Sequence, residues 1–297
     1  MWFKQAQFFN LEMKSSFTKE KLEGWLEQLP FTSCPPKLPF SQGWVSPTEE
    51  EDDPLVHSVS DFLLICLQTE AKLVPTKIIR QKLIEQIKKV EATEDRKVSN
   101  KEKYALKQEI YSSLLSQAFS VIYRDYAFID TKNGWLILNT NSPKYTENFT
   151  NFFKRSVNSK LVHPELKKPS PILTGWLLNN NHPKSIHIED SCVLQDPKRP
   201  ERTIRIQRQD LSANFIQALL KNNLEIAQMK MTWDDKVTFV LKNDFALQSL
   251  QYSDSIIEKD SEDKSFKADF LIMSGVVTQI FQELLKVFAK PVDNKKT

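Results

Sequence analysis

The sequence contains little glycine, little cysteine and no long apolar run. Only five of its 297 residues are glycine, which excludes a glycine-rich loop that cradles phosphates. Its three cysteines, Cys34, Cys66 and Cys192, are far apart and odd in number, which favours reduced thiols over a disulfide framework. No window reaches eighteen apolar residues, and the first residues lack the apolar core of a signal peptide. We therefore expect a cytoplasmic protein without membrane contact.

Apolar residues are plentiful, and the basic residues are concentrated in two segments. Hydrophobic residues make up 40% of the chain, and 297 residues are enough for two or three compact parts. The net charge is only +3, yet ten basic and five acidic residues lie between Pro75 and Lys107, a local charge of +5. Between Pro197 and Arg208 five basic residues accompany one acidic residue. This segregation favours a polyanionic partner, although basic helix faces usually serve only solubility.

Hydrophobic periodicity predicts a mixture of helices and strands. Thr18 and Ser212 are placed to cap helices, and Asn133-Gly134 between two apolar runs predicts a hairpin turn. The other predicted helices cover 75–90, 100–117, 142–157, 173–178 and 276–288. The predicted strands cover 2–11, 59–67, 119–129, 135–138, 186–194, 203–207, 224–233, 236–241, 245–252 and 268–273. Because hairpins join most strands and no regular βαβ alternation appears, we predict an α+β fold with antiparallel sheets.

Eight short segments follow one another over almost the full length of the chain. They are Trp2-Phe3-Lys4, Phe31-Thr32-Ser33-Cys34, Gly43-Trp44-Val45, Glu102-Lys103 with Leu106-Lys107, Leu114-Leu115 with Ala118-Phe119-Ser120, Ile129-Asp130-Thr131 with Asn133-Gly134, Gln209-Asp210-Leu211, and Ala268-Asp269-Phe270 with Met273-Ser274-Gly275. In this order and at these spacings they resemble the recombination-associated protein RdgC family, which are bacterial nucleoid-associated DNA-binding proteins.

The resemblance implies a curved subunit with several regions, two of which close into a ring-shaped homodimer around the duplex. Residues 1–74 would form the N-terminal part of the central region, 75–117 a basic helical hairpin at the tip, 118–170 the remainder of the central region, and 171–297 a C-terminal α+β base region. It also implies double-stranded DNA binding with little sequence preference at the nucleoid. Occupying the DNA would restrain strand exchange promoted by RecA, in functional competition with it.

Charge and resemblance together give a set of candidate site residues. Phe119 matches a phenylalanine that the family uses at the ring-closing contact, whereas its sequence context alone favours a core residue at the start of a strand. Arg208 with Gln209 matches a basic-Gln pair implicated in DNA contact. Gln117 and Gln228 depart from the family, which can carry Arg and Lys there. We expect DNA contacts from Lys77, Arg80, Lys88, Lys89, Arg96, Lys97, Lys101, Lys198, Arg199, Arg208 and Gln209.

Arg205 and Arg208 are three residues apart, so a regular strand places them on opposite faces. Arg208, near the expected end of the strand, is the stronger candidate of the two. Lys198, Arg199 and Arg202 are expected in a loop, where they would reach phosphates without fixed geometry.

Two other functions are compatible with the sequence. In the first, the apolar face of the C-terminal helix and the aromatic N-terminus bind a protein partner, and the basic charge is incidental. In the second, Asp125 with Asp130, or Asp254 with Asp269, holds the metal of a nuclease. No nucleophile motif or zinc pattern is present, so we expect no enzyme, no metal and no cofactor.

Overall fold

The computed structural model describes residues 1–12, 17–48, 53–157, 159–257 and 265–290. The sequence predicts a solvated acidic loop at 49–53, of which only Asp53 lies within these ranges.

The described chain forms a twelve-stranded antiparallel sheet. Along the path of paired strands the order is β2-β4-β5-β6-β1-β12-β11-β10-β8-β9, with β3 also paired to β4 and β7 to β1. The strands are β1 (Gln5–Glu12), β2 (Phe40–Val45), β3 (His57–Val59), β4 (Phe62–Lys72), β5 (Ser120–Asp130), β6 (Trp135–Leu138), β7 (Lys160–Val162), β8 (Ile186–Asp196), β9 (Arg199–Ile206), β10 (Glu225–Trp233), β11 (Val237–Lys242) and β12 (Leu247–Tyr252).

Seven helices accompany the sheet in the described ranges, which confirms the predicted α+β class. They are α1 (Lys19–Leu26), α2 (Thr76–Glu94), α3 (Asn100–Ser116), α4 (Pro143–Val157), α5 (Pro169–Asn179), α6 (Asn214–Lys221) and α7 (Phe266–Phe288).

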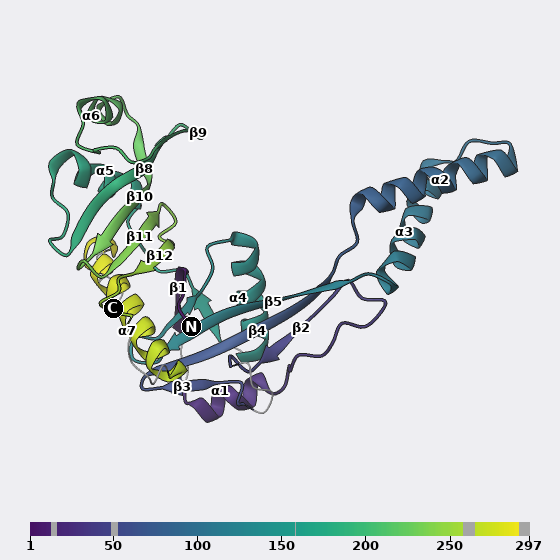
Figure 1. The fold of residues 1–297 in the computed structure, drawn as a ribbon, viewed down its shortest axis with the longest axis horizontal. Helices are drawn as coiled ribbons and strands as arrows, with labels where there is room; N and C mark the ends of the chain where they lie inside the picture. Colours follow the sequence, from purple (N-terminus) through teal and green to yellow (C-terminus); the bar gives the residue numbers. More distant parts are fainter. Residues whose placement is uncertain (13–16, 49–52, 158, 258–264, 291–297) are drawn as a thin grey trace, which may run out of the picture.

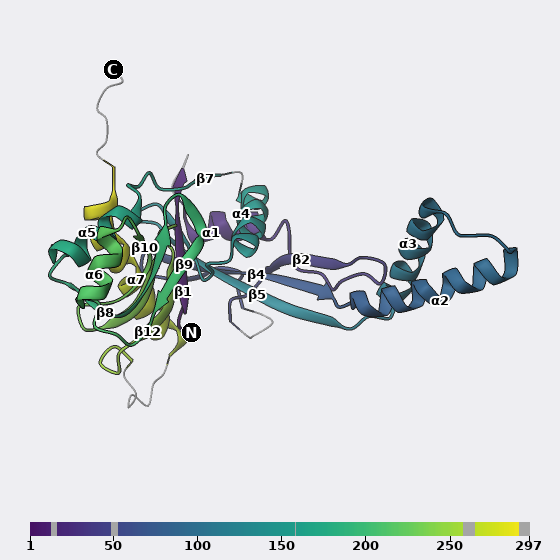
Figure 2. The same ribbon diagram turned by 90° about the horizontal axis from the view of Figure 1, so that it is seen from above.

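The molecule is curved, with two arms that rise from a common centre (Figure 1). One arm is the long β4–β5 ladder, which runs without interruption from Phe62 opposite Asp130 to Lys72 opposite Ser120 and carries α2 and α3 at its end. The other arm contains the C-terminal strands, with α5 and α6 on their outer side and β9 on the side toward the first arm (Figure 2). A concave space therefore lies between the two arms.

Strand β1 joins the two halves of the sheet. It pairs with β6 over four residue pairs and with β12 over two, Gln5 with Gln248 and Ala6 with Leu247. Its side chains alternate between two cores, because successive residues of a strand point to opposite faces. Phe8 packs in the core beneath α7, and Phe9 packs in the core beneath α1 and α4.

The structure corrects the sequence-based prediction at the starts of two helices. Residues 268–273, expected as a strand, form the first turns of α7, which Ser265 caps by accepting a hydrogen bond from the Ala268 N–H. Short apolar runs fit a buried strand or a buried helix equally well, which explains the error. Ser212 does not cap α6, because its hydroxyl donates to Asp210 and the N-cap residue is Ala213. The predicted cap at Thr18 is confirmed.

Helix α7 is long and apolar enough, by length and composition, to cross a membrane. Its side chains at Phe270, Val277 and Phe281 are buried against the sheets. Packing in the core therefore accounts for its apolar composition.

Candidate nucleic-acid interface

Helices α2 and α3 present almost all of their charged side chains to solvent. Only Ile79, Val98 and Leu115 are buried apolar residues in this part of the chain, so the helices are held by a narrow contact. The sequence-predicted DNA contacts in this region are all exposed: Lys77, Arg80, Lys88, Lys89, Arg96, Lys97 and Lys101. The structure thus groups them on one projecting element with exposed side chains.

Arg96 differs from the other basic residues because it binds carboxylates of both helices. Its guanidinium donates two hydrogen bonds to the Glu102 carboxylate, at 3.0 and 2.7 Å, and it also pairs with Glu94. Glu102 closes a capping box with Ser99 at the start of α3. The bonds from Arg96 and then from the Ser99 N–H lower the pKa of Glu102 to about 2. The charge of Arg96 is therefore matched within the loop that joins the helices.

The second basic group lies at the end of the other arm. Lys198 is in the turn between β8 and β9, and the exposed side chains of Arg199 and Arg202 lie on β9 rather than in the loop that the sequence predicts. Arg208 follows β9 in the left-handed conformation, with φ of 53°. Together with Gln209 it lines a groove of about 870 Å³.

The groove at Arg208 contains acidic as well as basic groups. Glu189, Asp190 and Asp210 line it alongside Arg208. The negative charges of these carboxylates repel a phosphate. The electrostatic potential around Arg208 is therefore less favourable for binding an anion than its exposed position suggests.

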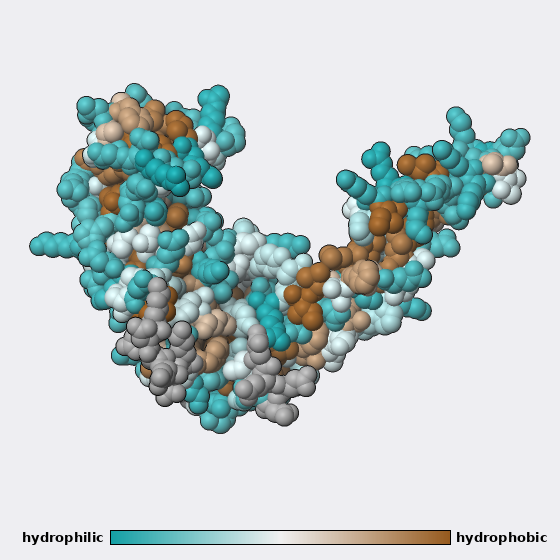
Figure 3. Space-filling model, viewed as in Figure 1, coloured by the Kyte–Doolittle hydropathy of each residue, from teal (hydrophilic) through white to brown (hydrophobic). Residues whose placement is uncertain are grey.

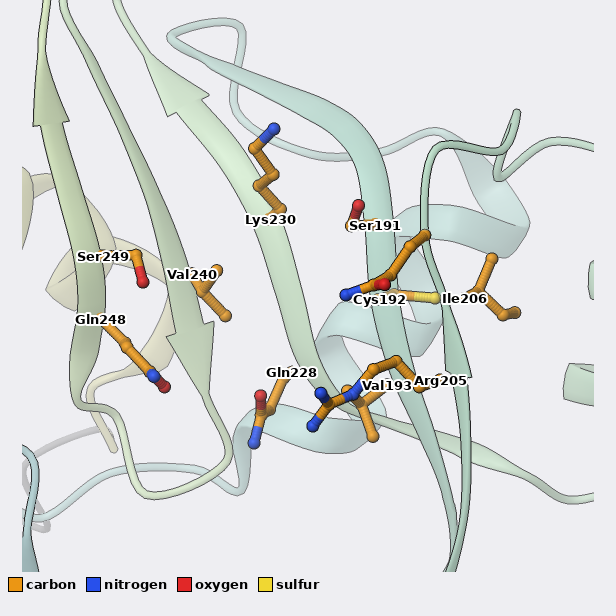
Figure 4. Close-up of a pocket in the computed structure, with 11 residues that line it drawn as sticks. Ser191, Cys192, Val193, Arg205, Ile206, Gln228, Lys230, Val240, Gln248 and Ser249 are labelled. Atoms are coloured by element: carbon orange, nitrogen blue, oxygen red, sulfur yellow. The ribbon is translucent and has the colours of Figure 1, made fainter.

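Arg205 lines a different depression from Arg208, as their three-residue spacing predicts. This depression, about 310 Å³ in volume, lies on the face of the C-terminal sheet that none of the helices in the described residues covers, and we call it the sheet cradle (Figure 4). Arg205 reaches across β8 toward Gln228 on β10, while Gln248 and Ser249 approach from β12. One guanidinium and several uncharged hydrogen-bonding groups thus surround this space.

Lys230 adds a second cation to the sheet cradle. Its ammonium lies 3.5 Å from the Asp190 carboxylate. A hydrogen bond from the Ser191 hydroxyl, and then the charge of Lys230, lower the pKa of Asp190. The sequence prediction omitted Lys230, Gln248 and Ser249 and ranked Arg205 below Arg208. The available signal was the alternation along β10, where the half-buried residues Gln228 and Lys230 alternate with the buried residues Met229 and Met231.

Phe119 projects from the junction between α3 and β5. Its side chain is 88% exposed, so the alternative of a core residue is wrong. The backbone at this point is fixed, because the Leu73 N–H donates to the Phe119 carbonyl. Leu73 and Ile122 are also exposed, and apolar residues are visible along this arm in Figure 3. The arm therefore carries an apolar surface beside its basic helices.

A family model described as "Putative exonuclease, RdgC" matches residues 1–290 of the chain. The chain belongs to the RdgC family. "Recombination-associated protein RdgC" of Aeromonas hydrophila subsp. hydrophila is 30% identical over 292 residues, with 96% of each chain covered. The protein of the same description from Halorhodospira halophila is 29% identical over 296 residues, covering 97% of this chain and 98% of the relative. The family expected from the sequence is thus confirmed, and with it an association with recombination.

The first acidic pair considered for a nuclease, Asp125 with Asp130, is separated in this RdgC family member. Asp125 and Asp130 are five residues apart on β5, which places them on opposite faces and about 16 Å apart along the strand. The Asp130 carboxylate accepts hydrogen bonds from the Lys132 and Asn133 N–H groups and from Thr278. It thereby holds the hairpin turn that the sequence predicts at Asn133-Gly134.

The other candidate pair is Asp254 with Asp269. Asp269 lies 3.6 Å from the amino group of Met1, and Asp254 follows β12. Across the ranges that the structure describes, no group of three or more His, Cys, Asp or Glu side chains is arranged to hold a metal ion.

The surfaces suggested for a protein-interaction module are largely internal in this RdgC family member. Phe3 is fully buried, and Trp2 packs on Tyr252 with 4.7 Å between the ring centroids. The apolar stripe of α7, which includes Phe281 and Leu284, belongs to the main core. These residues stabilise the fold instead of forming a free docking surface.

Proposed function

We propose that this protein binds double-stranded DNA without sequence preference, as a homodimer that closes into a ring around the duplex. The exposed basic residues at the ends of both arms of one curved subunit carry this proposal. Phosphates attract such groups and release condensed counterions, which supplies affinity that does not depend on base sequence. The sheet cradle adds Arg205 of β9 and Lys230 of β10, and β9 lies on the side of the C-terminal arm toward the first arm (Figure 2).

Ring closure is the part of the proposal that rests on Phe119 and its apolar surroundings. A two-fold dimer of curved subunits encloses a space when each subunit contributes two separate contacts. The exposed side chains of Phe119, Leu73 and Ile122 would supply one of them, since burying apolar area stabilises an interface. We place the protein in the cytoplasm on the nucleoid, where it would compete with RecA for DNA and restrain strand exchange.

A gel-shift titration with random-sequence duplex tests the binding step. If roughly six phosphates are neutralised, affinity falls by about two-thousandfold between 50 and 200 mM salt. A flat response to salt, or no binding at all, would contradict the proposal. The RecA step is tested by adding the protein to a strand-exchange reaction, where inhibition should be relieved by excess competitor duplex.

Hydrolysis of DNA is a second candidate, because the family model carries the word exonuclease in its description. We favour binding without cleavage, since the sequence-predicted acidic residues of β5 lie on opposite faces. Incubating end-labelled duplex with the protein, with and without magnesium, separates the two. Release of nucleotides only in the presence of magnesium would establish a nuclease activity. Duplex that is retarded in the gel but remains intact supports binding without cleavage.

A further inference from the structure

A cleft of about 520 Å³ opens where the sheet extends beyond helix α4. We call it the aromatic cleft. Phe40 and Gln42 on β2 and Tyr123 on β5 form its floor, and Tyr145 and Asn148 on α4 form its wall. It is separate from the sheet cradle and from the α2–α3 pair.

The cleft exists because helix α4 covers only part of this sheet face. Under α4 the same sheet face is packed tightly, with Trp44 in edge contact with Phe149 and Phe153. Four residues earlier on β2, at Phe40, the covering helix has ended, and the ring is 52% exposed. Tyr123 is 39% and Tyr145 40% exposed. Three aromatic rings are thus left half-covered at one site.

The two tyrosines have a spacing close to that needed for stacking. Their ring centroids are 6.5 Å apart and their planes are inclined by 50°. Stacked bases are separated by about 3.4 Å, so one base between two parallel rings requires about twice that distance. A rotation of the Tyr145 ring that removes the 50° inclination would make the two planes parallel.

Polar groups at the rim match the other parts of a nucleotide. Asn148 and Asn151 bring amide groups that both donate and accept hydrogen bonds, as base edges require. The Gln42 amide is held in place by donating to the Thr69 hydroxyl at 2.8 Å. Lys144 supplies a cation for a phosphate, whereas Glu147 can only accept hydrogen bonds from base amino groups.

We propose that the aromatic cleft binds an unpaired nucleotide of single-stranded nucleic acid, with its base stacked against Tyr123 and Tyr145. Stacking platforms of this kind tolerate any base, because every base has a flat π face. Paired bases inside a duplex cannot enter the cleft. The site therefore acts independently of enclosure of the duplex, and it distinguishes opened DNA from intact DNA.

Fluorescence anisotropy with a labelled twelve-residue thymidine oligonucleotide tests the site in the full-length protein. We expect Tyr123→Ala and Tyr145→Ala each to weaken binding roughly tenfold to a hundredfold, and Tyr123→Phe to bind like the unchanged protein. Tyr104→Ala is the matched control, since Tyr104 is 66% exposed on α3, away from the cleft. Affinity for intact duplex should change less than twofold in every variant.

An abasic oligonucleotide of equal length keeps the phosphates and removes the stacking partner. The unchanged protein should lose as much affinity for this probe as Tyr145→Ala loses for the thymidine oligonucleotide. Equal binding of the abasic and thymidine probes would overturn the proposal even if a tyrosine variant failed to fold. The proposal would also be overturned if a proline-rich peptide bound the cleft while the tyrosine variants kept the oligonucleotide affinity of the unchanged protein. If the protein failed to bind duplex but still bound the oligonucleotide, the proposed ring around duplex DNA would be rejected and the proposal for the aromatic cleft would be supported.

Discussion

Neutralising the sheet cradle should change how DNA binding responds to salt. The perturbation is the double variant Arg205→Gln with Lys230→Gln, which removes two cations and keeps shorter, uncharged side chains that still form hydrogen bonds. Both residues lie on the uncovered face of the C-terminal sheet. We expect no loss of fold, because neither side chain is part of the core.

The size of the effect follows from counterion release. Each phosphate contact contributes about 0.9 to the slope of log affinity against log salt. With roughly six contacts, raising salt from 50 to 200 mM weakens binding about two-thousandfold, and with four contacts about 150-fold. The difference of more than tenfold is readily measured by anisotropy titration of a labelled duplex at four salt concentrations.

The matched control is Lys221→Gln with Lys286→Gln. It removes the same net charge from α6 and α7, helices that pack with the buried side of the same sheet. We expect this variant to keep the slope of the unchanged protein. Equal slopes in the cradle variant and the unchanged protein would refute the reasoning, since they would show that no phosphate reaches the cradle.

Three further predictions concern a ring contact, a turn and the thiols. Phe119→Ala should leave stability within about 0.5 kcal/mol, because the side chain is exposed, but should speed dissociation from circular duplex; unchanged retention would count against ring closure. Asp130→Ala should cost about 2–4 kcal/mol in urea unfolding, and Asp130→Asn less, because the turn loses its buried acceptors. Burial raises the pKa of Cys66 to about 12 and of Cys192 to about 11, so at pH 8 both remain protonated. Only Cys34 should react quickly with a thiol reagent before unfolding, and rapid labelling of all three would disprove this.

The sequence contains most of the information about individual elements. The Asn133-Gly134 turn follows from local chemistry, since glycine adopts the positive φ of 68° found there without strain. The capping box at Ser99 and Glu102 is also a local pattern, Ser-x-x-Glu at the start of α3, although our sequence-based prediction did not include it. The error at 268–273 arose because a short apolar run has no period of its own, whereas the stripe through Phe270, Val277 and Phe281 is helical over 23 residues.

The sites depend on contacts that no local pattern encodes. The sheet cradle joins Arg205, Gln228 and Gln248 from three strands, and only the pairing of β8 with both β9 and β10 brings the first two together. The match of Arg96 to Glu102 likewise follows from the path of the loop. Charge density locates the basic segments, but it cannot separate an exposed cation from one that is already matched, as Arg96 is by Glu102.

Strand β1 also determines when the fold can be completed. Gln5 of β1 pairs with Gln248 of β12, which lies more than two hundred residues further along the chain. During synthesis the first strand leaves the ribosome early, and it must wait for β12 before the two halves of the sheet can join. Contacts of such long sequence separation form late and slowly. The unpaired edge of β1 is therefore the part of the nascent chain most in need of protection from aggregation.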